Sequence, residues 1–348
     1  MANANTFGVA VVGLGRFGLK RVHSISKDPR TRLRVVSDIA CDRAHDVADE
    51  MNCEFKTAWE EAVSRDDVDI VIVSTSTQFL SLIALGALQA GKHVLCEKPF
   101  GRNAQEVLPA VLAARNRGLA LKVGYNHRYH PALQKAHEIW GSGKLGRLHF
   151  LRCVYGHGGR AGYEREWRTQ AESAGGGQLL DQGVHALDLF RWFAGEFVEV
   201  KAISDTCYWP IAPLEDNIFA LLRNAEGCVA QLHASWTSWK NAFRFEVSAE
   251  HGYLSVSGLG GSYGTESLVH GVRVALGQTP QEYKFEFPQP DESLKMEWTD
   301  FLDCIEQGKA PQSSGEDGWR TLELAESIYA AARTASTSVD HQCSTASD

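Results

Sequence analysis

Short, uninterrupted apolar runs alternate with helix-like segments over the first 124 residues. Apolar runs without polar alternation are typical of parallel strands that are covered on both faces. One helical stretch, 77–90, ends at Gly91, a common helix stop. Strict alternation of strand and helix predicts an α/β fold with a doubly wound parallel sheet. The predicted strands of this sheet are 8–12, 32–37, 69–74, 92–96 and 120–124.

Beyond about residue 145, polar positions often alternate with apolar ones, and glycines and other turn residues separate the runs. This pattern predicts an α+β region with a large, mostly antiparallel open sheet, one face covered and the other free for a partner. Two helices, 293–307 and 316–334, follow the sheet. The predicted strands are 150–155, 198–204, 218–222, 228–235, 243–249, 253–257 and 267–274.

The change of pattern divides the chain into a first domain, 1–124, and a second, 125–335. The length of 348 residues agrees with two domains at about 150 residues each. One hypothesis is that helix 316–334 packs back on the first domain. The small, polar segment 336–348 is expected to be a flexible tail.

Charge and composition exclude several classes of function. A net charge of −8 argues against nucleic acid or an anionic membrane as the partner. No apolar run approaches the ~20 residues of a membrane span, and residues 1–7 lack the features of a secretory signal. Eight cysteines without a Cys-x-x-Cys pair are expected to be buried, reduced thiols. We therefore expect a cytoplasmic protein without a metal site.

A glycine motif, Gly13-Leu-Gly15-Arg-Phe-Gly18, directly follows the first predicted strand and opens a helix. In such a motif the first glycine allows a tight turn, the second lets the backbone approach a pyrophosphate, and the third permits close helix packing. The helix N-terminus then offers free N–H groups to the phosphates. The alternative is a glycine-rich turn without a ligand.

Asp38 closes the second strand, 20 residues beyond Gly18. A carboxylate at this place is expected to hold the adenosine ribose hydroxyls of a dinucleotide. Ile39 and Ala40 follow it and leave no obvious Arg or Lys clamp for a 2′-phosphate. The motif therefore favours NAD over NADP. A carboxylate that only caps the next helix is the alternative.

Lys98 follows the fourth strand, in the sequence Glu97-Lys98-Pro99. The carboxyl ends of parallel strands face the ligand crevice in this architecture. A cation there is able to hydrogen-bond the nicotinamide ribose and to help a nearby alcohol lose its proton. Pro99 favours an extended conformation at Lys98. Taken alone, such a lysine is more often a solvated surface charge.

Asp181 and His185 lie four residues apart after a glycine loop that begins at Gly175. This spacing predicts one amphipathic helix with both side chains on the same face. A neutral imidazole is able to accept an alcohol proton, and an adjacent carboxylate stabilises the resulting imidazolium. The alternative is a capping carboxylate and a core histidine. No third ligand stands at a spacing that would suggest a metal.

Taken in order, these motifs resemble those of the glucose–fructose oxidoreductase/inositol dehydrogenase (Gfo/Idh/MocA) family over residues 8 to 334. The motifs are Gly13-x-Gly15-x-x-Gly18, Glu97-Lys98-Pro99 and Gly175-Gly-Gly-x-Leu-x-Asp181-x-Gly-x-His185-x-x-Asp188. Further matches are Ala87-Leu-Gln-Ala-Gly-Lys-His-Val94, Arg128-Tyr129 with Pro131, and Ser314-Gly-Glu-Asp-Gly318.

The resemblance implies a Rossmann domain over 1–124 and a substrate-binding and oligomerisation domain over 125–335. It implies Lys98, Asp181 and His185 as the catalytic residues. The cofactor-binding residues that we expect are Gly13, Gly15, Arg16, Phe17, Gly18, Asp38, Thr75, Glu97 and Lys98. The sequence departs from the family at Ser76 and Leu80, where a proline and a histidine are usual, which bears on nicotinamide placement.

The segment 157–168 lies between the first strand of the second sheet and the Asp–His helix, where a substrate loop is expected. Arginine side chains suit phosphate or carboxylate groups, and aromatic rings stack on sugar faces. The alternative is a solvated loop whose arginines pair with Glu164 and Glu166. The substrate-binding residues that we expect are Arg128, His157, Arg160, Tyr163, Trp167 and Arg168.

These observations predict an NAD-dependent oxidoreductase that moves a hydride between nicotinamide and a secondary alcohol or ketone of a sugar, polyol or sugar derivative. If the loop arginines bind the substrate, that substrate is anionic. His185 takes the hydroxyl proton, Asp181 orients His185, and Lys98 steadies the developing alkoxide. A homodimer or homotetramer through the second sheet is expected. The alternatives are an NAD-dependent glycoside hydrolase without net redox change and a non-enzymatic, cofactor-binding regulator.

Overall fold

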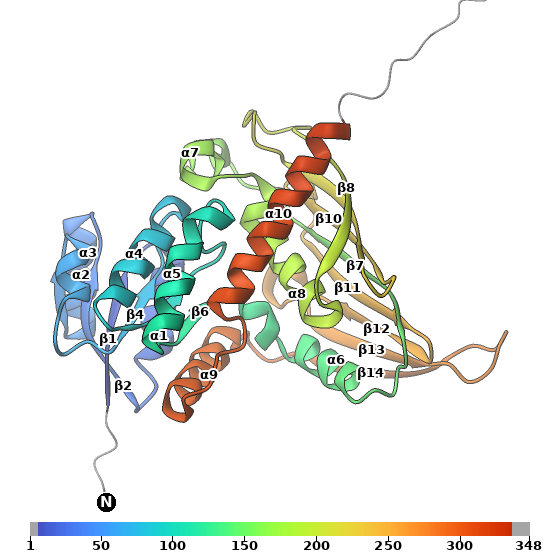
Figure 1. Ribbon diagram of the computed structural model, residues 1–348, viewed down its shortest axis with the longest axis horizontal. Coiled ribbons are helices and arrows are strands. Elements are labelled where there is room, and N and C mark those ends of the chain that lie inside the picture. The colour runs from blue at the N-terminus through green and yellow to red at the C-terminus, as the bar shows by residue number, and fades with distance from the viewer. Residues whose placement is uncertain (1–5, 336–348) are drawn as a thin grey trace, which may run out of the picture.

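Two sheets form the frame of the protein in the computed structural model, which describes residues 6–335 (Figure 1). The first sheet and its helices occupy one half of the molecule, and the larger sheet occupies the other. Helix α10 (Gly315–Ala335) crosses between the two halves. The predicted tail, 336–348, lies outside the described residues.

The first sheet is parallel and has the order β3-β2-β1-β4-β5-β6. All five predicted strands are present, and a short edge strand that was not predicted, β3, joins them. The doubly wound parallel sheet is thus confirmed. Its strands are β1 (Phe7–Val12), β2 (Thr31–Ser37), β3 (Glu54–Lys56), β4 (Ile70–Val73), β5 (His93–Cys96) and β6 (Leu121–Val123).

Both faces of this sheet are covered, which explains the unpatterned apolar strands. Along β1, Ala10 and Val12 belong to one hydrophobic cluster, whereas Val9 and Val11 belong to another. Because successive side chains point to opposite faces, each face has its own core. The helices of this half are α1 (Arg16–Ile25), α2 (Cys41–Met51), α3 (Trp59–Val63), α4 (Thr77–Gln89) and α5 (Ala104–Arg117).

The second sheet has eight strands in the order β14-β13-β12-β11-β7-β10-β9-β8. Every neighbouring pair is antiparallel except β7 and β10, which run parallel. The mostly antiparallel sheet is confirmed, with β14 as an edge strand that was not predicted. Its strands are β7 (Leu148–Gly156), β8 (Phe197–Asp205), β9 (Asn217–Asn224), β10 (Val229–Ser235), β11 (Ala242–Ala249), β12 (Gly252–Ser257), β13 (Glu266–Val272) and β14 (Gln281–Phe287).

Helix α8 (Val184–Ala194) covers one face of the second sheet. Phe190 of α8 packs on Phe245 of β11, with 5.9 Å between the ring centroids. On β9, Ile218 and Leu222 point into this core, whereas Phe219 on the other face is exposed. The sheet therefore has one buried and one open face, as the alternation predicted. The remaining helices of this half are α6 (Pro131–Gly141) and the short α7 (Ala171–Ala174), whereas α9 (Ser293–Gln307) packs on the first sheet.

The chain returns to the first sheet at its end. Trp298, Phe301 and Leu302 of α9 lie in the same cluster as Val9 and Val11 of β1. The carboxylate of Glu326 on α10 accepts a hydrogen bond from the N–H of Ala104 at the start of α5 (2.9 Å). The two C-terminal helices therefore join the two halves. The exact boundary between domains at residues 124 and 125 stays a prediction.

Seven cysteines lie in the described part of the chain, and all are free thiols. Cys96, Cys153 and Cys228 are buried, whereas Cys41 and Cys207 are exposed. The expectation of buried thiols is therefore wrong for the last two, which occupy a helix start and a loop. Among residues 6–335, no helix is long and apolar enough to cross a membrane, and no group of three or more acidic, histidine or cysteine side chains is placed to hold a metal ion.

Candidate functional site

The glycine turn after β1 has the geometry that a dinucleotide requires. Gly13 has φ +89°, and an added Cβ would lie 2.5 Å from the carbonyl oxygen of Ser74 and 2.9 Å from the Thr75 methyl group. A Cβ on Gly18 would lie 1.9 Å from the carbonyl oxygen of Gly13. Gly15, in contrast, faces open space. Two glycines thus permit tight packing, and the middle one leaves room for a pyrophosphate.

Helix α1 begins at Arg16, and no side chain caps its first N–H groups. Gly15, Arg16 and Phe17 are exposed, and among the described residues the Arg16 guanidinium has no ion-pair partner. A helix N-terminus with free N–H groups and a nearby cation suits a phosphate. Lys20 lies over the Phe17 ring, with 5.2 Å from Nζ to the ring centroid.

Asp38 is buried at the end of β2, next to the glycine turn. Its carboxylate accepts hydrogen bonds from the N–H groups of Leu14 (2.7 Å) and Ala40 (2.9 Å). Both oxygens of the Asp38 carboxylate also accept from the Arg43 guanidinium, at 3.4 Å and 3.3 Å. The sequence interpretation missed this cation, because Arg43 is five residues further along, on α2. The carboxylate still occupies the place expected for a ribose ligand.

The residues that depart from the family pattern are accommodated by the core. Ser76 stands at the N-terminus of α4, where its side chain makes no capping hydrogen bond. Leu80 is buried in α4, and its carbonyl oxygen accepts a hydrogen bond from the Cys96 thiol at 3.7 Å. Thr75 is half-buried beside Gly13. At position 80, a leucine that packs in the core therefore stands where the family usually has a histidine.

Glu97 is buried, and its side chain faces away from the open edge of the sheet. It forms an ion pair with Arg21 of α1 at 2.6 Å. Arg21 also pairs with Glu297 of α9 at 2.6 Å. Burial opposes the charge of Arg21, but Glu297 and Glu97 together hold its pKa above the usual value. The Glu97 carboxylate is thus engaged in the core, so a contact of Glu97 with the cofactor would come from its backbone.

Lys98 lies at the carboxyl end of β5, and the peptide bond to Pro99 is cis. Its ammonium donates a hydrogen bond to the backbone carbonyl oxygen of Asp181 and lies 3.8 Å from the Asp181 carboxylate. Burial lowers the pKa of Lys98, against the opposing effect of Asp181. The structure therefore brings together two of the three predicted catalytic residues, which come from different halves of the molecule.

Asp181 lies on a π-helical turn, Leu179–Gly183, that precedes α8. The single helix that the sequence pattern predicted is thus interrupted at its first turn. The Asp181 carboxylate accepts hydrogen bonds from Arg168 (3.0 Å) and the Tyr163 hydroxyl (3.2 Å). Burial opposes the ionisation of Asp181, but Lys98 and Arg168 keep its pKa below the usual value. Asp181 is therefore a carboxylate at neutral pH.

A second carboxylate holds this turn in place. Glu215 is buried and accepts hydrogen bonds from the N–H groups of Gly177 (3.1 Å) and Leu179 (2.9 Å) and from the Tyr329 hydroxyl (2.8 Å). A Cβ on Gly177 would lie 2.0 Å from the carbonyl oxygen of Glu215. The glycine before the turn is therefore needed for close approach, and π-turns of this kind are frequent at functional sites.

His185 is buried on α8, and its ring stacks on His127, with 3.8 Å between centroids and 19° between planes. Neither ring nitrogen of His185 has a hydrogen-bond partner among residues 6–335, and Nδ1 is fully buried. Burial lowers the pKa of His185 well below its usual 6.5, and His127 and Lys98 act in the same direction. His185 is therefore a neutral imidazole with a free lone pair at pH 7.

The expected contact between Asp181 and His185 is not present in the described chain. The π-turn directs the Asp181 carboxylate to Arg168 and Tyr163 instead. His127, which stacks on His185, was not among the predicted site residues. It follows β6 in the sequence Tyr125-Asn-His-Arg-Tyr-His130, and two histidines just beyond a buried parallel strand were the available signal.

The predicted substrate loop is in part a set of internal ion pairs. Arg160 and Arg168 both pair with Glu166, at 2.5 Å and 2.9 Å, and Arg165 pairs with Glu164 at 3.3 Å. Trp167 is partly exposed and lies beside Arg168. These pairs are those of the alternative that the sequence left open, and substrate binding by the loop stays a prediction. Its arginines are paired with glutamates, while Arg168 also reaches Asp181.

His157 and Tyr163 face the site from this loop. Their rings meet edge to face at 5.7 Å, and the Nδ1 of His157 accepts a hydrogen bond from the N–H of Gly159 (2.9 Å). Burial lowers the pKa of His157. The Tyr163 hydroxyl, like the Arg168 guanidinium, links the loop directly to Asp181.

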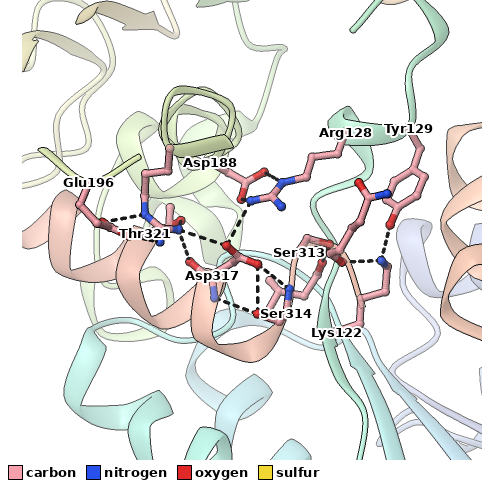
Figure 2. Close-up of polar contacts among 12 residues, drawn as sticks. Lys122, Arg128, Tyr129, Asp188, Glu196, Ser313, Ser314, Asp317 and Thr321 are labelled. Carbon is pink, nitrogen blue, oxygen red and sulfur yellow. Dashed lines mark hydrogen bonds and ion pairs between the residues drawn. The ribbon is translucent and has the colours of Figure 1, made fainter. Parts of the chain in front are cut away.

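Arg128 does not lie on an open substrate surface. It is buried and makes two hydrogen bonds to Asp188 of α8, at 2.8 Å and 2.6 Å. Figure 2 shows Arg128 between Asp188 and Asp317 of α10, with 3.4 Å from its guanidinium to Asp317. Its guanidinium is thus engaged with two carboxylates and joins α8 to α10. The prediction that Arg128 binds substrate finds no support in this placement.

The fold and the site together define a dinucleotide-binding oxidoreductase: a glycine turn, a carboxylate and an ammonium at the carboxyl edge of the first sheet, and a neutral imidazole on helix α8. The family model for the oxidoreductase family with an NAD-binding Rossmann fold matches residues 7–125. The model for the GFO/IDH/MocA C-terminal domain matches residues 133–255. The chain therefore belongs to the GFO/IDH/MocA family of oxidoreductases, and its cofactor is NAD.

Curated relatives and a solved structure agree with this assignment. The 1,5-anhydro-D-fructose reductase of Ensifer adhaerens is 29% identical over 80% of this chain and 81% of its own. The D-apiose dehydrogenase of Paraburkholderia graminis is 26% identical over 94% of this chain and 88% of its own. The structure of levoglucosan dehydrogenase with NADH and levoglucosan has a TM-score of 0.85 at 21% identity, covering 94% of this chain and 98% of that one.

Proposed function

We propose that the protein catalyses hydride transfer between NAD and a secondary alcohol or ketone of a sugar or polyol, with His185 as acid and base. The observation that carries this proposal is the His185 imidazole, neutral and without a hydrogen-bond partner among residues 6–335, near the Lys98–Asp181 pair. The names of the relatives support the substrate class, since they reduce or oxidise small carbohydrates.

NAD, when bound, supplies the hydride acceptor. His185 takes the proton of the substrate hydroxyl, because its lone pair is free and its neutral form is favoured by burial. Lys98 holds the substrate oxygen and stabilises the negative charge that develops on it. Asp181 acts mainly on Lys98, since its carboxylate and its backbone carbonyl both face that ammonium.

The loop charges favour a neutral carbohydrate over a sugar acid or sugar phosphate. An anionic group would need a guanidinium that is free to form a new pair. Arg160, Arg165 and Arg168 each have a glutamate partner already. Binding an anion there would require breaking one of these pairs.

The open face of the second sheet supports a homo-oligomer. Exposed apolar side chains, Val154, Ile203, Phe219 and Leu221, recur across β7, β8 and β9 on the face opposite α8. A contiguous exposed apolar surface is typical of a protein interface. We expect light scattering to give a dimer or tetramer, and Phe219→Lys with Leu221→Lys to lower the mass. A wild-type monomer at micromolar concentration would contradict this proposal.

A substrate screen tests the reaction. The protein is incubated with NAD, or in parallel with NADP, and a panel of neutral sugars, polyols, sugar acids and nucleotide sugars, and NADH is followed by its absorbance. We expect steady NADH formation with a neutral sugar or polyol and a clear preference for NAD. Release of an aglycone from a glycoside without net NADH would instead identify the hydrolase. No turnover with any carbohydrate would contradict the proposed function.

A further inference from the structure

Two large aromatic side chains are exposed close to the substrate loop. Tyr208 is 62% exposed and Trp239 is 68% exposed. Their rings stand at 81° to each other with 4.9 Å between centroids. Tyr208 follows β8, whereas Trp239 lies between β10 and β11, so two separate loops form one aromatic corner. Exposing this much ring surface is unfavourable unless something covers it.

Aromatic contacts connect this corner to the predicted catalytic residues. Tyr208 meets Trp209 at 5.4 Å, and Trp209 meets Tyr163 at 5.7 Å. The Tyr163 hydroxyl in turn donates a hydrogen bond to Asp181 at 3.2 Å. The corner is therefore the exposed end of a row of packed aromatic rings that leads outward from Asp181 through the buried Tyr163.

The loop that carries Tyr208 is held by one carboxylate. Asp216 accepts hydrogen bonds from the N–H groups of Cys207 (2.8 Å), Tyr208 (2.8 Å) and Trp209 (2.9 Å). Burial opposes the ionisation of Asp216, but these N–H groups keep its pKa below the usual value. The backbone under the exposed rings is thus fixed in advance, which lowers the entropic cost of binding.

The same loops are tied to each other and to the substrate loop. Asn217 donates a hydrogen bond to the Thr237 hydroxyl at 2.8 Å, and Trp209 Nε1 donates to the Trp236 carbonyl at 3.0 Å. The substrate loop passes directly against the rings, because a Cβ on Gly159 would lie 2.4 Å from Trp209 and one on Gly158 would lie 3.1 Å from Trp239. The corner and the loop are therefore packed directly against each other.

We propose that Tyr208 and Trp239 form a second sugar-binding subsite, so that the natural substrate is an oligosaccharide or glycoside with one ring near His185 and another on this corner. The inference rests on the proposed function. Aromatic rings present flat, apolar faces that suit the C–H face of a sugar. A nucleotide sugar fits less well, because its diphosphate would need a free guanidinium and the loop arginines are paired.

Binding measurements on the NADH complex test this subsite without depending on turnover. Glucose, cellotriose and maltotriose are titrated calorimetrically into the wild type and into Tyr208→Ala/Trp239→Ala. We expect one trisaccharide to bind more tightly than glucose, and the double variant to lower its affinity about tenfold while glucose changes less than twofold. Tyr283→Ala removes an exposed ring of β14 and serves as the matched control.

Three results would overturn the subsite. The first is that the double variant binds the trisaccharide as tightly as the wild type does, or that its affinity for the trisaccharide falls no more than its affinity for glucose. The second is UDP-glucose binding that depends on both rings when trisaccharide binding does not. The third is a change of mass in light scattering on removal of the two rings, which would make the corner a contact between copies. Absence of NADH formation in the sugar screen contradicts the proposed reaction instead, and the titration separates the two failures.

Discussion

His185→Ala is expected to lower turnover with NAD by about 10²–10⁴-fold, because proton transfer by a placed base contributes about that much. His185 is the only predicted catalytic residue whose side chain makes no hydrogen bond within residues 6–335. Steady-state NADH formation on the sugar that the screen identifies measures the effect. The affinity for NADH, read from a fluorescence titration, should stay close to that of the wild type.

His251→Ala is the matched control, because His251 is an exposed histidine in the turn between β11 and β12. It should retain wild-type turnover. His185→Asn keeps a polar side chain against His127 and separates loss of the base from loss of packing. Unaltered turnover in both His185 variants would remove this residue from the proposed mechanism.

The acid limb of the pH–rate profile follows from the same residue. His185 acts as a base only when it is neutral, which holds above its pKa in the folded protein. Burial, His127, Lys98 and His130 all lower that pKa well below 6.5. Protonation of His185 should therefore leave turnover unchanged between pH 8 and pH 6.5. Turnover should fall only at more acidic pH, where His185 becomes protonated. A wild-type acid limb centred near 6.5 would contradict the buried, neutral imidazole.

Arg21→Leu is expected to destabilise the protein by about 3–5 kcal/mol, because it leaves the buried carboxylates of Glu97 and Glu297 without their common partner. Arg21 is 1% exposed, so water cannot replace the guanidinium. Urea unfolding measured by circular dichroism gives the free energy of unfolding. The triple change Arg21→Leu/Glu97→Gln/Glu297→Gln should recover part of the loss by removing the uncompensated charges.

Arg320→Ala provides the comparison, because Arg320 pairs with Glu316 and Glu323 on the exposed face of α10. Exposed pairs of this kind contribute about 0–1 kcal/mol, so this variant should unfold close to the wild type. Equal losses in Arg21→Leu and Arg320→Ala would show that the buried cluster is not a major source of stability.

Most of the fold follows from local patterns in the sequence. The apolar strands of the first sheet are buried on both faces, and their composition alone predicts this. The two strands that were missed, β3 and β14, lie at sheet edges. β3 has only three residues, and most side chains of β14 are exposed. β3 is too short to show a pattern, whereas β14, Gln281-Glu-Tyr-Lys-Phe-Glu-Phe287, does alternate polar and aromatic residues, a strand signal that the sequence interpretation overlooked.

The candidate site was predicted where its residues stand at the ends of strands. Gly13, Asp38 and Lys98 each follow a buried parallel strand, so the sheet itself places them at one edge. The partners of buried charges were not predictable in the same way. Glu97 pairs with Arg21, and Arg128 with Asp188, across 76 and 60 residues of sequence. Sequence alone does not say which carboxylate a distant guanidinium will meet.

The turn that carries Asp181 shows the same limit at short range. Spacing of four residues predicted a direct contact with His185, as in a regular α-helix. The contacts of Glu215 with Gly177 and Leu179 widen the turn before the helix begins. A loop residue just before β9, more than 30 positions away, thus holds the turn that carries Asp181, and no periodicity in the helix itself reports it.

The packing of α9 on the first sheet bears on how the molecule is made. Trp298, Phe301 and Leu302 cover part of one face of a sheet whose strands all precede residue 124, and helices α1 and α2 pack in the same cluster. During synthesis the part that α9 covers stays bare until the ribosome has finished nearly the whole chain. The cofactor half is therefore built from both ends of the polypeptide, and transplanting it into another protein would require carrying residues 293–307 along with the N-terminal segment.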